Sequence, residues 1–511
     1  MMVRFGERLP PWINWIKKNI ALVIILFGIV LRLGQYVANR SLWMDEAKLA
    51  LNIVSRSFVE LTQPLSYDQG APLGFLLVQK TVVQVFGNRD YILRLVPLVA
   101  GITAMLLFYK VANSYVEGAG VPVALGLFAV SSPLVYYASE VKQYSSDAMI
   151  SLLLLFVAGK WVEENTNVKY FIALVFIGAL SLWMSHPALF ILAGISLGLA
   201  LDRLVERDWS RLIWLGAAFL VWLASFAILY FVSLRSLMTN TRLIDYWRGS
   251  FMPMPPWQNI IWFPKAFITM LESPAGVLTV SIGSFVFLLV FLIGCFSLFF
   301  RNWQKAVILV IPFPVTLLAS GLGKYPFGNR LLLFILPLAF LLVAEGMRRV
   351  LLVLRKIGPR AALSLWSALA ILLLFEPTCF ALQEFWHPYL GEDIKPLISY
   401  MTQHKQNADS VYVYYGASSA FRYYAPQYNL GNSSYIVGIF SRQEPTNYIQ
   451  ELDRLSGRGR VWFLFSHNCD QCFVNEEAYF LSHLDKIGAR IDEFEAPDAS
   501  IYLYNLALAR P

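Results

Sequence analysis

Four short clusters of polar residues could carry chemistry in this chain, and each lies at the edge of an apolar segment. The first is Ser41–Ala47 (SLWMDEA), where Asp45 and Glu46 stand side by side after Trp43. A carboxylate at a lipid surface could act as a base that removes a proton from a hydroxyl group. The alternative is structural, because acidic residues also stabilise the positive end of a helix.

The second cluster is Tyr136–Tyr144 (YYASEVKQY), which brings Glu140 and Lys142 into one short turn among tyrosines. A lysine close to the mouth of this face could bind a phosphate. The same residues would also suit a surface ion pair set in an aromatic belt at the membrane boundary.

Two further clusters flank later apolar segments. His186 is the only histidine among the first 385 residues. It is either a structural histidine or a hydrogen-bonding partner for a sugar, a phosphate or a metal. In Gly323–Arg330 (GKYPFGNR), Lys324 and Arg330 accompany Tyr325 on a Gly/Pro turn. The planar fork of arginine suits a phosphate, although both cations could instead extend to the membrane surface.

This combination of carboxylates and cations beside apolar segments suits chemistry on a lipid-linked phosphate. The lipid tail would lie in a groove within the membrane, and lysine, arginine or a metal would bind the phosphate. A carboxylate would deprotonate the attacking hydroxyl, and the phosphate would leave once its charge is stabilised.

Membrane-spanning helices must position these clusters. The 511 residues are 57% hydrophobic and only 14% charged, which excludes a disordered, collagen-like or disulfide-scaffold protein. Arg32 and Arg94 lie inside predicted spans, so each should pair with an acid or reach the interface, and Asp45 and Asp90 are candidate partners. About eleven apolar runs are long enough to cross a membrane; they are 20–38, 91–111, 119–138, 147–161, 170–186, 187–202, 212–233, 276–299, 305–321, 330–347 and 361–383.

The distribution of Lys and Arg predicts a cytoplasmic N-terminus, because alternate short loops carry most of these residues. The first run is then a retained anchor rather than a signal peptide. An odd number of spans places the four clusters, the long loops 39–90 and 234–275, and everything beyond residue 385 on the outer face. Topology thus explains most of the net charge of +8, so nucleic acid is not expected as a partner.

The sequence predicts two domains, a transmembrane domain over 1–385 and a small α/β domain over 386–511. The second carries 10 Lys and Arg against 14 Asp and Glu, a soluble composition. Cys469 and Cys472 within it could form a local disulfide, bind a metal or do neither. The expected strands and helices alternate; strands are predicted at Ser410–Tyr415, near Ile436, at Val461–Phe465, near 490–495 and near 500–504, and helices at 393–407, around Phe421, at 446–456 and at 475–487.

The chain resembles the GT-C superfamily of integral-membrane glycosyltransferases. Within it, the bacterial protein-mannosyltransferase and aminoarabinose-transferase group (glycosyltransferase family 39-like) is the most similar. The segments that carry the resemblance follow the family's order over residues 20–340; they are SLWMDEA (41–47), PLGFL (72–76), LRLVP (93–97), SPLVYYASEVKQY (132–144), SHPAL (185–189) and KYPFGNRLL (324–332).

The resemblance implies a GT-C fold and an inverting glycosyltransferase at the outer face of the cytoplasmic (inner) membrane. The enzyme would move a sugar from a polyprenyl-phosphate donor to a hydroxyl group of a lipid, a glycan or a protein. Asp45 would be the catalytic base, with Glu46 beside it. Glu140 would orient the acceptor or, together with His186, hold a divalent metal. Because clustered acids and histidines are few here, a tight metal site is not expected.

The resemblance also assigns the donor phosphate to Lys142, at a position where many relatives carry arginine, and to Arg330. Lys324 and Tyr325 would complete that grip, and Tyr144 is a further substrate-binding candidate. Two alternatives from other functional classes remain: a transporter or flippase for lipid-linked sugars, and a protein that binds such lipids without catalysis. A transporter should show paired halves or Gly/Pro-broken spans at matching positions, and the sequence shows no convincing inverted repeat.

Overall fold

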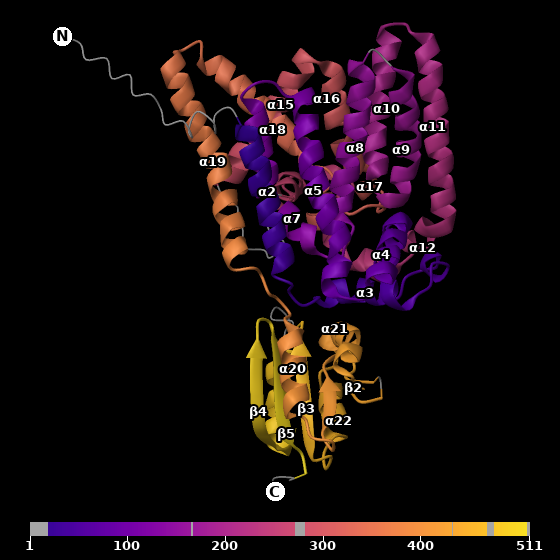
Figure 1. Ribbon diagram of the computed structural model, residues 1–511, viewed down its shortest axis with the longest axis vertical. Helices are drawn as coiled ribbons and strands as arrows, with labels where there is room; N and C mark the ends of the chain where they lie inside the picture. The colour runs from indigo at the N-terminus through magenta and orange to yellow at the C-terminus, as the bar shows by residue number, and fades with distance from the viewer. Residues whose placement is uncertain (1–18, 165–166, 271–281, 432, 468–474, 508–511) are drawn as a thin grey trace, which may run out of the picture.

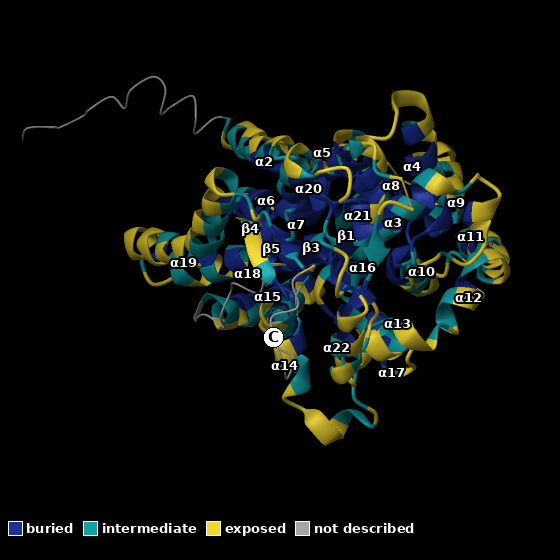
Figure 2. Ribbon diagram, turned by 90° about the horizontal axis from the view of Figure 1, so that it is seen from below, coloured by how far each residue is buried: buried dark blue, intermediate teal, exposed yellow. Residues whose placement is uncertain are grey.

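A bundle of helices makes up most of the molecule, and a small α/β unit lies against one end of it (Figure 1). The structure is a computed structural model that describes residues 19–164, 167–270, 282–431, 433–467 and 475–507. Buried residues form the centre of the bundle, while outer helices such as α11 and α19 expose many apolar side chains (Figure 2). Exposed apolar helix faces of this length suit contact with lipid.

Eight helices of the described residues are long and apolar enough to cross a membrane, with α16 and α17 counted as one. They are α2 (Ile20–Val37), α5 (Asp90–Tyr115), α8 (Tyr144–Glu163), α10 (Ala188–Val205), α11 (Trp209–Leu229, continued to Met238 through α12), α15 (Ile282–Arg301), α16 (Trp303–Val310) with α17 (Pro312–Gly321), and α19 (Pro359–Trp386).

The predicted run 119–138 is not one straight span. It forms α6 (Gly120–Val130) and α7 (Ser132–Tyr136), and the two parts are bent by 58°. Pro133 explains the break, because proline is favoured in the first turn of a helix and disrupts the continuation of a preceding one. The bend carries the chain through a short turn into the Glu140 segment.

Two other predicted runs form helices that differ from a typical span. The run 170–186 is α9 (Val168–Met184), which has only 17 residues. The run 330–347 is α18 (Leu336–Leu354), whose second half is charged. Almost every residue of the first half of α18 is buried, so its apolar run packs in the protein core. The sequence predicts about eleven spans. The described chain contains eight helices that are long and apolar enough to cross a membrane, or nine if the bent pair is one span.

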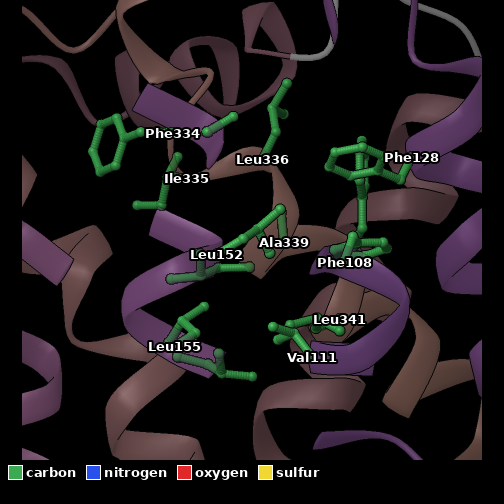
Figure 3. Packing of buried hydrophobic residues seen from close by; sticks show 14 of the residues in the cluster. Phe108, Val111, Phe128, Leu152, Leu155, Phe334, Ile335, Leu336, Ala339 and Leu341 are labelled. Atoms are coloured by element: carbon green, nitrogen blue, oxygen red, sulfur yellow. The ribbon is translucent and has the colours of Figure 1, made fainter. Parts of the chain in front are cut away.

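Side chains from α5, α6 and α8 meet those of α18 in this core (Figure 3). Phe108 of α5 stacks on Phe128 of α6 with ring centroids 4.5 Å apart. Leu152 of α8 and Leu341 of α18 belong to the same buried cluster. Tyr144 and Phe327, which belong to segments that carry polar clusters, are part of the same buried cluster, so packing helps to fix the positions of these segments.

The predicted outer loops contain helices of their own. The loop 39–90 includes two helices and the loop 234–275 includes three short ones. They are α3 (Met44–Ser55) and α4 (Leu73–Phe86) in the first, and α12 (Arg235–Met238), α13 (Thr241–Tyr246) and α14 (Trp262–Thr269) in the second.

The α/β unit contains a five-stranded sheet in the order β2-β1-β3-β5-β4. Strand β1 runs parallel to β2 and β3, whereas β5 runs antiparallel to β3 and β4. The strands and helices predicted in this region are present; Cys469 and Cys472 lie outside the described residues. The elements are α20 (Ile394–His404), β1 (Ser410–Val413), α21 (Ser418–Tyr424), β2 (Ile436–Val437), α22 (Thr446–Asp453), β3 (Arg460–Ser466), α23 (Glu476–Ile487), β4 (Ala489–Ala496) and β5 (Ala499–Asn505).

Helices α15 and α18 cross at two glycines. A Cβ atom on Gly294 would lie 1.8 Å from the carbonyl oxygen of Leu342, and one on Gly346 would lie 2.1 Å from that of Val290. Small residues of this kind let two membrane helices approach backbone to backbone.

We therefore expect Gly294→Ala to separate α15 from α18 and to lower the free energy of unfolding by roughly 1–3 kcal/mol, as overpacking does. Gly216 in α11 is a matched control, since a Cβ atom added there would meet nothing within 4 Å. Gly216→Ala should leave the thermal midpoint unchanged or raise it, because alanine favours helix. Equal midpoints for the two variants in detergent would contradict this account of the crossing.

Candidate functional site

Asp45, in the first turn of α3, bridges two cations from distant parts of the chain. Its Oδ1 is 3.1 Å from Nζ of Lys142, and its Oδ2 is 2.9 Å from Nη2 of Arg330. Gln69 joins them, since its Nε2 donates to Asp45 Oδ1 (3.0 Å) and its Oε1 accepts from Lys142 Nζ (2.7 Å). Three of the four predicted clusters thus contribute a charged side chain to one place.

The group carries more positive than negative charge. Burial opposes ionisation of Asp45, but Lys142 and Arg330 outweigh it and hold the pKa of its carboxyl well below the usual range. Burial lowers the pKa of Lys142 even though Asp45 attracts its proton, and Arg330 adds to the lowering by repulsion. The pKa of Asp45 falls because two cations favour its charged form. Lys142, in contrast, has to share this carboxylate with Arg330, so the carboxylate does not compensate for its burial. A second anion would complete the compensation of this buried charge.

Three aromatic rings surround the Arg330 guanidinium. Its Cζ lies 5.5 Å from the ring centroid of Trp43, 5.8 Å from that of Tyr144 and 5.5 Å from that of Trp247. Cations are attracted to such ring faces, and the bulky rings limit how the side chain can turn. Trp247, which follows α13, and Gln69 were not predicted as site residues, because neither lies in a charged cluster.

Glu46 takes part in a different network from its neighbour. It is fully buried and accepts from Arg94 Nε (3.1 Å) and Nη2 (2.7 Å) and from the backbone N–H of Val141 (2.8 Å). Arg94 also donates to the carbonyl oxygens of Arg40 (2.6 Å) and Ser41 (3.2 Å). The acidic partner of Arg94 is therefore Glu46 rather than Asp45 or Asp90. This pair ties the start of α3 to the segment that carries Lys142.

Glu140 is completely buried, and no hydrogen bond to either carboxyl oxygen is formed by the described residues. Burial, followed by the charge of Glu46, raises the pKa of Glu140 to about 8. At neutral pH the side chain is therefore mainly a neutral acid. Nearby, Arg40 donates to Ser139 Oγ (3.0 Å) and lies over the ring of Tyr136.

The other predicted substrate-binding residues differ in how far they are buried and in whether they contact the Asp45 group. Tyr144 forms part of the wall around Arg330, and Tyr325 donates its hydroxyl to the Leu331 carbonyl (2.8 Å) and packs on Phe190. His186 is half-buried, yet its Nε2 is buried and unpartnered among the described side chains. Burial lowers the pKa of His186 to about 4. Lys324 is exposed, so the structure does not bring it into the Asp45 group.

A divalent metal was an open alternative, with Glu140 and His186 as ligands. In the part of the chain that the structure describes, no three His, Cys, Asp or Glu side chains gather closely enough to hold a metal ion. Glu140 also interacts with Arg330 and Lys142, so the donor set beside it is cationic. These residues do not fit a metal site, and the chemistry considered below uses none.

The α/β unit contacts the loop that leads into α3, at the bundle end where α21 meets α3 (Figure 1). Glu392 Oε2 accepts from the backbone N–H of Met44 (2.7 Å), and Tyr424 Oη accepts from that of Leu42 (2.8 Å). Lys395 Nζ pairs with Asp90 at 3.0 Å. The residue before Asp45 is thus held from outside the bundle.

No family model matches this chain, and no curated protein sequence does either. Solved structures do match. The apo ArnT of Cupriavidus metallidurans has a TM-score of 0.55 and 12% identity over 98% of this chain and 100% of that one. The same protein bound to undecaprenyl phosphate has a TM-score of 0.51 and 12% identity over 97% and 98%. AglB, the oligosaccharyltransferase of Archaeoglobus fulgidus, in complex with an inhibitory peptide and a dolichol-phosphate, has a TM-score of 0.54 and 11% identity over 96% and 74%.

These similarities confirm the predicted fold, that of the GT-C membrane glycosyltransferases. Together with the apolar helices, they show a multi-pass membrane protein that carries a small C-terminal sheet. At 11–12% identity they establish the fold alone.

The raised pKa of Glu140 predicts a pH dependence of stability. Folding favours the neutral carboxyl, so its contribution is complete below the unfolded pKa of about 4.3 and is lost as the pH rises through about 8. We expect the thermal midpoint to fall by a few degrees over that range and Glu140→Gln to flatten the fall. The exposed Glu444 supplies the control, since Glu444→Gln should keep the wild-type slope. If the thermal midpoint of Glu140→Gln fell with pH as steeply as that of the wild type, a raised pKa of Glu140 would not be the cause of the fall.

Proposed function

We propose that this protein is a glycosyltransferase that takes a sugar from a polyprenyl-phosphate carrier and passes it to a hydroxyl group of a lipid, a glycan or a protein. The observation that carries the proposal is the sharing of Asp45 between two buried cations, Lys142 and Arg330. A phosphate-binding pair and a carboxylate base are thereby held within one hydrogen-bonded group.

The donor phosphate would bind between Lys142 and Arg330. These cations exceed their single counterion, and arginine can contact two phosphate oxygens at once. The solved structures with this fold include one bound to undecaprenyl phosphate and one in complex with a dolichol-phosphate. The exposed apolar helix faces next to the site would accommodate the polyprenyl tail.

Asp45 would gain basicity when the donor arrives. In the free protein, both cations stabilise its charged form and keep it a weak base. A bound phosphate competes for the same cations, which removes that stabilisation and raises the proton affinity of the carboxylate. The base would thus become effective only when the donor is in place.

The reaction would then be a single displacement with inversion. Asp45 removes the proton of the acceptor hydroxyl, and the resulting oxygen attacks the anomeric carbon from the face opposite the phosphate. The bond between the anomeric carbon and the phosphate oxygen breaks, and its electron pair stays on polyprenyl phosphate. Lys142 and Arg330 stabilise the charge that develops there.

Glu140 and Glu46 would serve this reaction differently. Glu140, neutral and without a hydrogen-bond partner in the described chain, can donate its proton in a hydrogen bond that orients the acceptor. Glu46, committed to Arg94, would position the loop rather than touch substrate. The reaction would take place at the outer face of the cytoplasmic membrane, with 1–385 as the catalytic domain and 386–511 as an outer domain docked on it.

A transporter or a non-catalytic binder could also use the two cations. In either of them Asp45 would serve only as the counterion of the cations, so a variant that removes the base while binding is retained distinguishes catalysis from transport or binding alone.

The decisive variant is Asp45→Asn, assayed in nanodiscs against a panel of undecaprenyl-phosphate monosaccharides. Transfer should fall at least about 100-fold, as the loss of a general base does. Binding of bare undecaprenyl phosphate should tighten several-fold, because the cations lose their competing partner. Lys142→Met is the matched control, and it should weaken that binding. Full transfer by Asp45→Asn would refute the role of the base, and transport of lipid without any product by the wild type would favour a flippase.

A further inference from the structure

Three buried polar atoms near the site have no hydrogen-bond partner among the described residues. They are Asp147 Oδ1, Ser185 Oγ and His186 Nε2. Asp147 is 4% exposed and Ser185 is fully buried. A buried polar group left without a partner costs about 1–3 kcal/mol, so three of them from two neighbouring segments call for a ligand.

The three residues come from two segments that pack together. Asp147 lies in the first turn of α8, and Ser185 and His186 form the loop between α9 and α10, which both pack against α8. The Ser185 hydroxyl lies beside the Asp147 carboxyl, and Tyr325 also interacts with that carboxyl. In this loop the Ser185 N–H donates to the Ser181 carbonyl at 2.8 Å.

This group adjoins the phosphate-binding cations. Tyr144 and Asp147 are three residues apart and therefore lie on the same face of α8, about 4.5 Å apart along the helix axis. The ring of Tyr144 contacts the Arg330 guanidinium. In a sugar phosphate the sugar ring is bonded directly to a phosphate oxygen, so a ring whose phosphate sits at Arg330 must lie within about one helical turn of it.

We propose that Asp147, Ser185 and His186 form the subsite for the donor sugar and that they bind its adjacent free hydroxyl groups. The inference rests on the proposed function, because it requires a sugar on the lipid phosphate. The Asp147 carboxyl group can form hydrogen bonds with two neighbouring hydroxyls, and Ser185 can both donate and accept. His186, kept neutral by burial, can accept one further hydrogen bond or donate one. Tyr144 would offer its ring to the apolar face of the sugar.

Binding of matched lipids to the full-length protein in nanodiscs tests this subsite. The probes are bare undecaprenyl phosphate and undecaprenyl phosphate that carries glucose, galactose, mannose, arabinose or aminoarabinose. The variants are Asp147→Asn and Ser185→Ala. The control is Ser181→Ala, because the buried Ser181 hydroxyl already donates to the Gly178 carbonyl at 2.8 Å.

The wild type and Ser181→Ala should bind one sugar-linked lipid more tightly than the bare lipid phosphate. Asp147→Asn should lose roughly tenfold of that preference, which is the usual effect of losing a buried hydrogen bond. Ser185→Ala should lose several-fold, and both should bind bare undecaprenyl phosphate within about twofold of wild type, since the cations are intact.

Two results would overturn the subsite while leaving the proposed function standing. One is unchanged sugar preference in both variants alongside normal transfer by the wild type. The other is an equal loss of affinity for the bare lipid phosphate and the sugar-linked lipid, which would indicate a general structural role. Absence of transfer by the wild type with every donor, despite tight binding of bare undecaprenyl phosphate, would instead refute the proposed function.

Discussion

The sharing of one carboxylate, Asp45, between Lys142 and Arg330 is the interaction on which the rest of this structure depends. Two buried cations cannot be held together without a counterion, because their mutual repulsion adds to the cost of burial. One carboxylate stabilises the pair of cations, but the group of three side chains keeps a net positive charge. We propose that the remaining positive charge gives the free protein affinity for a further anion, such as the phosphate of the donor.

Much of the surrounding architecture holds this arrangement in register. The Glu46–Arg94 pair connects the start of α3 to the Val141 backbone from inside the bundle. Glu392 and Tyr424 of the α/β unit bind the same loop from outside. Adjacent acids thus have separate tasks, since Asp45 faces the cations and Glu46 anchors the backbone. Such division follows from helix geometry, because neighbouring residues on a helix point about 100° apart.

The sequence predicted the fold class, the α/β unit and the charged residues that meet in the site, because charges beside apolar runs are conspicuous. It could not predict Gln69 or Trp247, which become site residues only through tertiary contacts. Nor could it separate Arg330 from Lys324 on the same turn, since orientation decides which cation is buried. Hydropathy alone also does not distinguish an apolar helix in lipid from one, like the first half of α18, that is enclosed by protein.

A structure of the full-length protein with undecaprenyl phosphate would test the central claim most directly. The account predicts that the phosphate lies about 3 Å from both Lys142 Nζ and the Arg330 guanidinium, the usual length of charge-assisted hydrogen bonds. It also predicts that Asp45 no longer bridges the two cations and faces open space where an acceptor can enter. A phosphate bound elsewhere, for example at the exposed Lys324, with the Asp45 bridge intact, would contradict the account.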